Sequence, residues 1–219
     1  KGETLLSYAR RFSELQEEAW QALLEPKAQG RVRFGIPDDY ASGLLPKILE
    51  GFSEREPQIE VEVHCATSLI LSEMIESGKL DLALISRRDN SAQGQLIKQE
   101  QLVWATSPNH AAHLKDPIPL AAFQEDCMIR QSAVENLKKT ARRHRIAYSS
   151  PNLAALLAVT NSGLAVAALP QSSVPNHLRL LSEKEGFPKL PSVEVALIKT
   201  TTTSSTAVEA LALTITNSF

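Results

Sequence analysis

Residues 59–86, IEVEVHCATSLILSEMIESGKLDLALIS, carry the clearest fold signal in this chain. The first seven alternate apolar and polar side chains, the period of two typical of a strand with one covered face. The apolar residues that follow recur at helical spacing, with Thr67 and Ser68 at the expected helix start and Gly78 at its expected end. Residues 80–85 are almost wholly apolar, as in a strand covered on both faces. The stretch therefore predicts strand, polar loop, helix and strand.

Two strands joined by a helix of this length run parallel, with a right-handed crossover. The polar loop at Thr67 and Ser68 would then lie outside the carboxyl end of a strand. Open α/β sheets bind their ligands at such ends. We therefore expect this loop to face a ligand.

The flanking sequence extends the same alternation of strands and helices. Residues 31–37 predict a strand, and a polar turn then leads to a helix whose apolar face lies within residues 44–52, with Pro46 in its first turn. Residues 31–86 thus predict β-α-β-α-β with a parallel sheet. A second α/β unit of similar size follows, with expected strands at 102–107, 127–130, 146–149, 164–169 and 193–199 and expected helices at 133–145, 153–160 and 207–215.

Composition excludes several classes of protein. A formal net charge of -2 argues against a nucleic-acid-binding surface on this part of the protein, because neutralising phosphates needs a basic patch. Two cysteines that lie far apart fit a reducing compartment better than a disulfide scaffold. The sequence has neither a membrane span nor a signal peptide. We expect a cytoplasmic protein with no membrane partner.

Residues 4–24 predict a helix with a narrow apolar seam. Leu5, Tyr8, Phe12 and Leu15 fall at a and d positions of successive heptads. The seam could pack on its own domain or on a second molecule. We favour a second molecule, because residues 25–30 look like a flexible connector that sets the helix apart.

Three segments resemble the LysR-type transcriptional regulators. Residues 2–11, GETLLSYARR, are similar to the linker helix of that family, and Thr67-Ser68 with residues 78–84, GKLDLAL, are similar to its polar loop and GxLDLA block. Residues 162–170, SGLAVAALP, are similar to its GLG(I/V)ALLP segment, with Ala165 where glycine is usual. The order and spacing of these segments carry the resemblance, which covers most of the chain.

The resemblance implies an α/β fold, a two-lobed effector domain like a type II periplasmic binding protein, preceded by an N-terminal linker helix. Residues 1–26 would form the linker or dimerisation helix, residues 31–103 plus 197–219 lobe I, and residues 104–196 lobe II. Strands 102–107 and 193–199 would cross between the lobes. The winged helix-turn-helix of the family would precede Lys1, so the chain would bind DNA only through that missing domain, as part of a homodimer or homotetramer.

If the strand ends of the two lobes face each other, polar residues at the helix starts line a cleft. Free N–H groups at helix starts suit a carboxylate or a similar anion. Thr67 and Ser68 match a position where the family contacts effectors, and their alternative role is plain N-capping. The candidate ligand-binding residues are Asp38, Asp39, Thr67, Ser68, Arg130, Ser132 and Ser149.

Two alternatives stay open for the charged residues of this cleft. Arg130 could bind an acidic effector in a bidentate way, or could bridge to Asp38 or Asp39. The two aspartates could meet an amine or cap the next helix. We expect a small-molecule effector, a carboxylate or an amino-acid-like compound.

Other chemistry finds little support in the sequence. His64 and Cys65 are adjacent in a strand and should point to opposite faces, so we expect Cys65 to be buried and inert, with Cys127 a slightly better redox candidate. The histidines show no metal spacing, and no phosphate loop or catalytic triad signature appears. We expect no metal, no cofactor and no enzyme. The sequence favours the ligand-sensing and oligomerisation domain of a regulator, with a free-standing solute-binding protein as the alternative.

Overall fold

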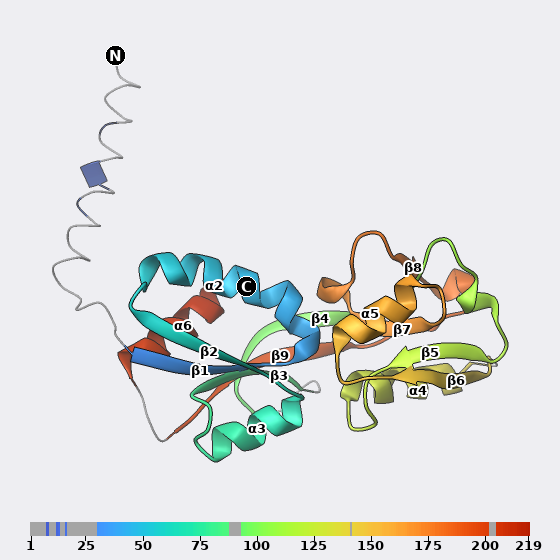
Figure 1. Cartoon of the computed structure of the whole chain (residues 1–219), viewed down its shortest axis with the longest axis horizontal. Helices are drawn as coiled ribbons and strands as arrows, with labels where there is room; N and C mark the ends of the chain where they lie inside the picture. The colour runs from blue at the N-terminus through green and yellow to red at the C-terminus, as the bar shows by residue number, and fades with distance from the viewer. Residues whose placement is uncertain are drawn as a thin grey trace.

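The computed structural model describes residues 8, 12, 13, 16, 30–87, 93–140, 142–201 and 205–219. Helices and strands alternate along most of this length (Figure 1). The strands are β1 (Gly30–Ile36), β2 (Ile59–Cys65), β3 (Leu82–Arg87), β4 (Gln95–Thr106), β5 (Ile118–Ala122), β6 (His144–Ser149), β7 (Val166–Pro170), β8 (Arg179–Leu181) and β9 (Ser192–Lys199). The α-helices are α2 (Asp38–Arg55), α3 (Ser68–Glu76), α4 (Met128–Lys138), α5 (Leu153–Asn161) and α6 (Thr206–Asn217), and short 3-10 helices are η1 (Ala112–Leu114), η2 (Gln171–Ser173) and η3 (Glu183–Glu185).

The predicted β-α-β-α-β unit is present and parallel. Strand β1 lies between β2 and β3 and pairs with both in parallel, with Ile36 opposite Cys65 and Phe34 opposite Leu82. Gly78 follows α3 with a φ of +69°, a left-handed conformation that glycine adopts without steric cost. The carboxyl ends of β1, β2 and β3 therefore meet on one side, as the sequence predicted.

Two strands join the halves of the molecule. Strand β9 pairs antiparallel with β3, while β4 pairs antiparallel first with β9 and then with β7 and β8. The sequence predicted a strand only from residue 102, but β4 begins at Gln95. Its first half is mostly polar and only Glu100 is buried there, with a register shift between Leu96 and Lys98, so its residues do not show the pattern of a buried strand.

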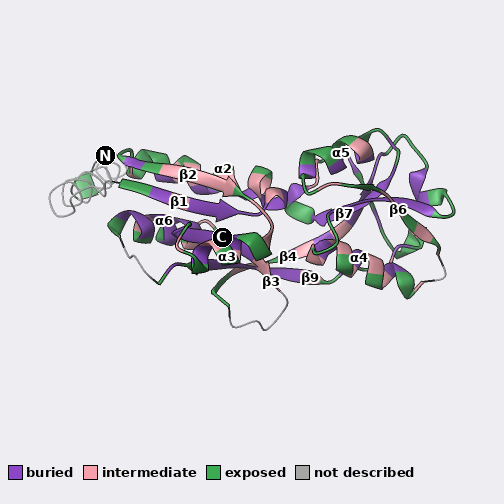
Figure 2. Ribbon diagram, turned by 60° about the horizontal axis from the view of Figure 1, so that its bottom comes forward, coloured by how far each residue is buried: buried purple, intermediate pink, exposed green. Residues whose placement is uncertain are grey.

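Each half has its own apolar core. In the first, helices α2 and α6 cover one face of the sheet around Phe34 and Leu84, and α3 covers the other face around Leu71. In the second, α4 and α5 pack with Trp104 and Leu169. Buried residues accordingly run along the strands of both halves (Figure 2). We call the half around Phe34 lobe I and the half around Trp104 lobe II.

Two helix starts differ from the sequence prediction. Residues 127–130 are the start of α4 and not a strand, because Ile129, Ala133 and Leu137 recur every four residues and are buried on one helix face. Helix α2 begins at Asp38, directly after its N-cap Pro37, so Pro46 lies inside the helix and not in its first turn.

Little of the predicted linker helix belongs to the described part of the chain. Leu5 and Leu15 lie outside it. Tyr8 and Phe12 are described, and their exposed fractions are 63% and 70%. Among the described residues, no helix is long and apolar enough to cross a membrane.

A candidate ligand-binding cleft

A cavity of about 740 Å³ lies between the two lobes. Lobe I contributes the carboxyl ends of β1, β2 and β3 and the first turns of α2 and α3. Lobe II contributes the loop after β5, the first turn of α4, and Pro151 and Asn152 just before α5. The polar and apolar residues around it include Asp38, Asp39, Cys65, Thr67, Ser68, Ser72, Ser86, Phe123, Gln124, Asp126, Cys127, Met128 and Asn152.

Thr67 and Ser68 have a structural role and also line the cleft. Thr67 is the N-cap of α3, and its hydroxyl accepts a hydrogen bond of 3.5 Å from the N–H of Ile70. The hydroxyl of Ser68 accepts a hydrogen bond of 2.9 Å from the N–H of Ser86 at the end of β3. The first-turn N–H groups of Ser68 and Leu69 have no acceptor within the helix, because of their position. They are suited to an anionic group.

Asp38 links the two lobes. Its carboxyl oxygens accept hydrogen bonds of 2.6 Å from the N–H of Leu153 and 3.3 Å from the side-chain amide of Asn152. Asn152 is the N-cap of α5, where a carboxylate also interacts favourably with the helix dipole. The sequence left two roles open for Asp38, pairing with an amine or capping the next helix. Asp38 does cap a helix, but that helix is α5 of lobe II.

Asp39 differs from Asp38 in its surroundings. The residue is only 9% exposed, and it lines the cleft. Burial raises the pKa of this carboxyl to about 7, and the nearby carboxyls of Asp38 and Glu100 raise it further, although its own backbone N–H acts in the opposite direction. A carboxyl with this pKa is divided about equally between its neutral and charged forms at neutral pH.

Arg130 and Ser149 do not line the cleft. The guanidinium group of Arg130 donates hydrogen bonds of 3.1 Å to the carbonyl oxygen of Phe123 and 3.4 Å to the hydroxyl of Ser149. It also forms an ion pair of 3.1 Å with Glu125. The expected bridge to Asp38 or Asp39 is not formed. The sequence predicted Arg130 on a strand, whereas it lies in the first turn of α4, where its side chain is held by Phe123, Ser149 and Glu125.

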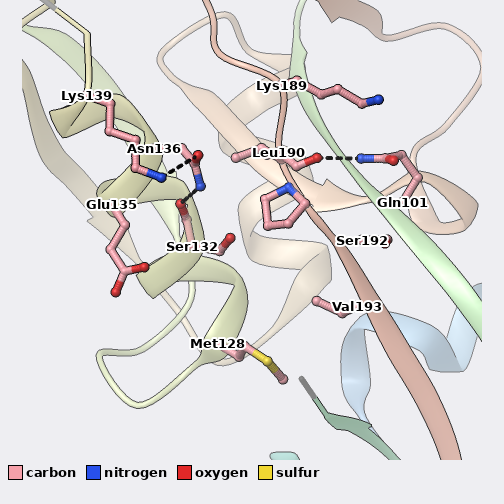
Figure 3. Close-up of a pocket in the computed structure, with 11 residues that line it drawn as sticks. Gln101, Met128, Ser132, Glu135, Asn136, Lys139, Lys189, Leu190, Ser192 and Val193 are labelled. Carbon is pink, nitrogen blue, oxygen red and sulfur yellow. Dashed lines mark hydrogen bonds between the residues drawn. The ribbon is translucent and has the colours of Figure 1, made fainter. Parts of the chain in front are cut away.

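Ser132 lines a second cavity, of about 700 Å³, on the side of lobe II next to the crossing strands (Figure 3). Several polar groups there bond to each other: the amide of Gln101 donates to the carbonyl oxygen of Leu190 at 2.8 Å, and that of Asn136 to the carbonyl oxygen of Ser132 at 2.8 Å. Met128 lines both cavities. The cleft is the better candidate site, because helix starts of both lobes converge on it.

Both cysteines line the cleft, and both are free. Cys65 is exposed at the end of β2, so the expectation that it is buried was wrong: its strand is at the edge of the sheet. Partial loss of solvent raises the pKa of the Cys65 thiol, and deeper burial raises that of Cys127 to about 11. The reactive thiolate is therefore scarce at neutral pH.

Several cleft residues were not predicted from the sequence. Asn152 could have been found, because it precedes a predicted helix as an N-cap. Phe123, Gln124 and Asp126 follow β5, a short strand that the sequence analysis did not identify. Within the described ranges, no group of three or more metal-binding side chains could hold a metal ion.

The comparisons with known proteins agree with this architecture. The family model described as the LysR substrate binding domain matches residues 26–218. The chain therefore belongs to the LysR substrate-binding domain family of transcriptional regulators, and the two-lobed fold predicted from the sequence is confirmed.

Among curated proteins, the chain is 39% identical over 197 residues to the HTH-type transcriptional regulator DgdR of Burkholderia cepacia, covering 90% of this chain and 67% of that protein. Among solved structures, it is similar to the regulatory domain of HypT from Salmonella typhimurium, with a TM-score of 0.71 and 15% identity over 89% of this chain and 97% of that one. It is also similar to the effector binding domain of QuiR in complex with shikimate, with a TM-score of 0.67 and 15% identity over 87% and 97%. At these identities the two structures support the fold alone.

Proposed function

We propose that this chain is the effector-sensing part of a LysR-type transcriptional regulator and that its effector binds in the cleft between the lobes. The observation that carries the proposal is the cavity of about 740 Å³, to which both lobes contribute helix starts and hydroxyl groups. The effector domain of QuiR was solved with a small molecule bound, shikimate, which supports the same role for this chain.

The proposed mechanism is a change in the relation between the lobes. Strands β4 and β9 run through both halves, so a change of lobe closure must bend or twist these two strands. The effector acts only through its different affinity for the two arrangements. The bond from Leu153 to Asp38 already joins the lobes across the cleft, so an effector that inserts there changes a contact on which closure depends.

The whole regulator would include parts that this chain does not contain. DNA binding is assigned to a helix-turn-helix domain preceding Lys1, and assembly into a dimer or tetramer to the helix at residues 4–24. A regulator that acts on DNA would work in the cytoplasm. The alternative, a free-standing solute-binding protein, uses the same cleft but leaves the apolar seam at Tyr8 and Phe12 without a role.

The test is a thermal-shift screen of small carboxylates and amino acids against the chain, followed by calorimetry of each binder. We expect Thr67→Val, which removes one cleft hydroxyl, to weaken binding about 3- to 10-fold, the effect of one hydrogen bond. Ser132→Ala, in the second cavity, is the matched control and should bind as the parent does. Binding that Ser132→Ala abolishes and Thr67→Val leaves intact would move the site to the second cavity.

A further inference from the structure

We infer that the cleft recognises its effector through a protonated amino group that lies against the carboxyl group of Asp39. This inference rests on the proposed function of the cleft as the effector site. It assigns the effector to a chemical class, amines and amino acids, which membership of the family does not specify.

The charges around the cleft are all of one sign. Five carboxyl side chains line it: Asp38, Asp39, Glu73, Glu76 and Asp126. No lysine, arginine or histidine lines it among the residues that the structure describes. A purely anionic effector would meet these carboxylates without a cationic side chain to offset them, whereas an ammonium group is attracted by all five.

Asp39 is the carboxyl best placed to bind such a group. Asp38 already accepts two hydrogen bonds from α5, and Glu73, Glu76 and Asp126 are exposed to solvent. Asp39 is buried, it borders the cavity, and no other residue of the described chain donates a hydrogen bond to its side chain. Its own backbone N–H only partly offsets the cost of burying this charge, and a charge-assisted hydrogen bond from an ammonium group would lower that cost further.

The protein itself supplies no positive partner for Asp39. The titratable groups around it are Asp38 and Tyr40 on α2, Glu100 on β4 and Cys127 at the start of α4. Glu100 has a cationic partner of its own, the ammonium of Lys98 at 2.7 Å. Asp39 thus faces one tyrosine, one thiol and two further carboxyls, and an incoming cation would be its first counter-charge.

An α-amino acid would satisfy both chemical features of the cleft. Its amino group would meet Asp39, and its carboxylate the free N–H groups in the first turn of α3, which line the same cavity. Simple amines fit the first feature only, and simple carboxylates only the second.

The pH dependence of ligand affinity tests the inference without any mutation. Asp39 must be ionised to pair with an ammonium group, and its pKa without ligand is about 7. Affinity for amines should therefore rise about tenfold from pH 6 to pH 8, as the ionised fraction rises. A ligand bound through its carboxylate alone would show no such rise, and repulsion by ionised Asp39 would weaken it instead.

The experiment uses matched probes with one carbon skeleton: L-leucine, isoamylamine and 4-methylpentanoate, with the corresponding sets for alanine, phenylalanine and glutamate. Calorimetry at pH 6, 7 and 8 on the whole chain, on Asp39→Asn and on Ser132→Ala supplies the comparison. We expect binding only by members with an amino group, a loss of at least about tenfold in Asp39→Asn, and no change in Ser132→Ala. The rise with pH in the parent stands as evidence even where Asp39→Asn does not fold.

Each contrary result has a definite meaning. Carboxylates that bind without an amino group, lose affinity in Thr67→Val and bind equally well in Asp39→Asn would overturn the amine inference and leave the cleft as the effector site. Binders that neither cleft variant affects would overturn both proposals, and so would a panel without any binder. Amine binding that is constant from pH 6 to pH 8 would overturn the role of Asp39.

Discussion

The carboxyl group of Asp38, at the start of α2 in lobe I, accepts a hydrogen bond of 2.6 Å from the backbone N–H of Leu153, the first residue of α5 in lobe II. One lobe therefore caps a helix of the other. Asp38 lines the cleft, and a second bond, from the side chain of the cleft residue Asn152, supports the first. If the lobes separate, the N–H of Leu153 at the start of α5 loses its acceptor, so lobe closure and the capping of α5 are coupled.

Asp38→Ala should loosen the contact between the lobes. The change removes two hydrogen bonds and a negative charge at the start of α5, and we expect a loss of about 0.5–2 kcal/mol in the free energy of unfolding. Urea denaturation measures this loss, and small-angle scattering should show a larger radius of gyration without ligand. The control is Asp126→Ala, which removes an exposed cleft carboxylate and should alter neither quantity; equal effects of the two substitutions would contradict the capping role.

Asp81 should make the protein sensitive to acid. It is buried, and its carboxyl accepts hydrogen bonds from the backbone N–H, Nε and Nη2 of Arg33, at 2.8, 3.1 and 2.7 Å. Burial alone would raise the pKa of Asp81, but the bonds from Arg33 outweigh it and hold the pKa below its usual value. The stabilisation is therefore complete above the unfolded-state pKa of about 4 and is lost as the pH falls through the lowered folded-state pKa.

Asp81→Asn tests that assignment. It leaves the guanidinium group of Arg33 without its charged partner, and we expect a loss of about 1–3 kcal/mol at pH 7. As the pH falls below the unfolded-state pKa of about 4, the stabilities of the variant and the parent should approach each other, because residue 81 is then neutral in both unfolded chains and the folded parent gradually takes up a proton there. Unfolding free energies measured between pH 2 and pH 7 that differ by a constant amount would show that the charge of Asp81 does not matter.

The sequence predicted the part of the fold that local patterns encode. The alternation in residues 59–65, the hydroxyl at Thr67 and the glycine at position 78 are local signals, and the structure places a strand, an N-cap and a left-handed residue there. The first half of β4 was missed, because its residues are polar and it is a strand only through pairing with β9, nearly a hundred residues away.

Three predicted site residues, Arg130, Ser132 and Ser149, do not line the cleft, because the sequence did not show where their side chains point. Asp38, Asp39, Thr67 and Ser68 follow strands that were correctly predicted, and they line the cavity. The directions of Arg130 and Ser132 depend on where α4 starts and on which of its faces packs on lobe II. Ser149 ends the predicted strand β6, but its hydroxyl is bonded to Phe123 and Arg130. Sequence patterns located the carboxyl ends of the strands in lobe I. They did not show how the side chains of lobe II are oriented on the other side of the cleft.

The predicted seam of the N-terminal helix should hold two chains together. Tyr8 and Phe12 are largely exposed in the single chain, which is costly for an apolar seam unless a partner covers it. We expect Leu5→Glu with Phe12→Glu to lower the mass measured by sedimentation equilibrium, with Ser13→Glu, at an outer heptad position, as the control. A mass that is the same for all three chains would show that this helix does not mediate assembly.

Arg130 should support the cleft wall and not the ligand. Its guanidinium group joins the first turn of α4 to Phe123 and Ser149, and its side chain is largely buried, so Arg130→Met should lower the free energy of unfolding by about 1–3 kcal/mol. Glu125→Ala removes only the exposed partner of the ion pair and should cost at most about 1 kcal/mol. At temperatures where both variants are folded, effector affinity should stay within about threefold of the parent, the scale of less than one hydrogen bond. A loss of affinity in Arg130→Met far beyond that, at unchanged stability, would instead place the guanidinium group on the effector.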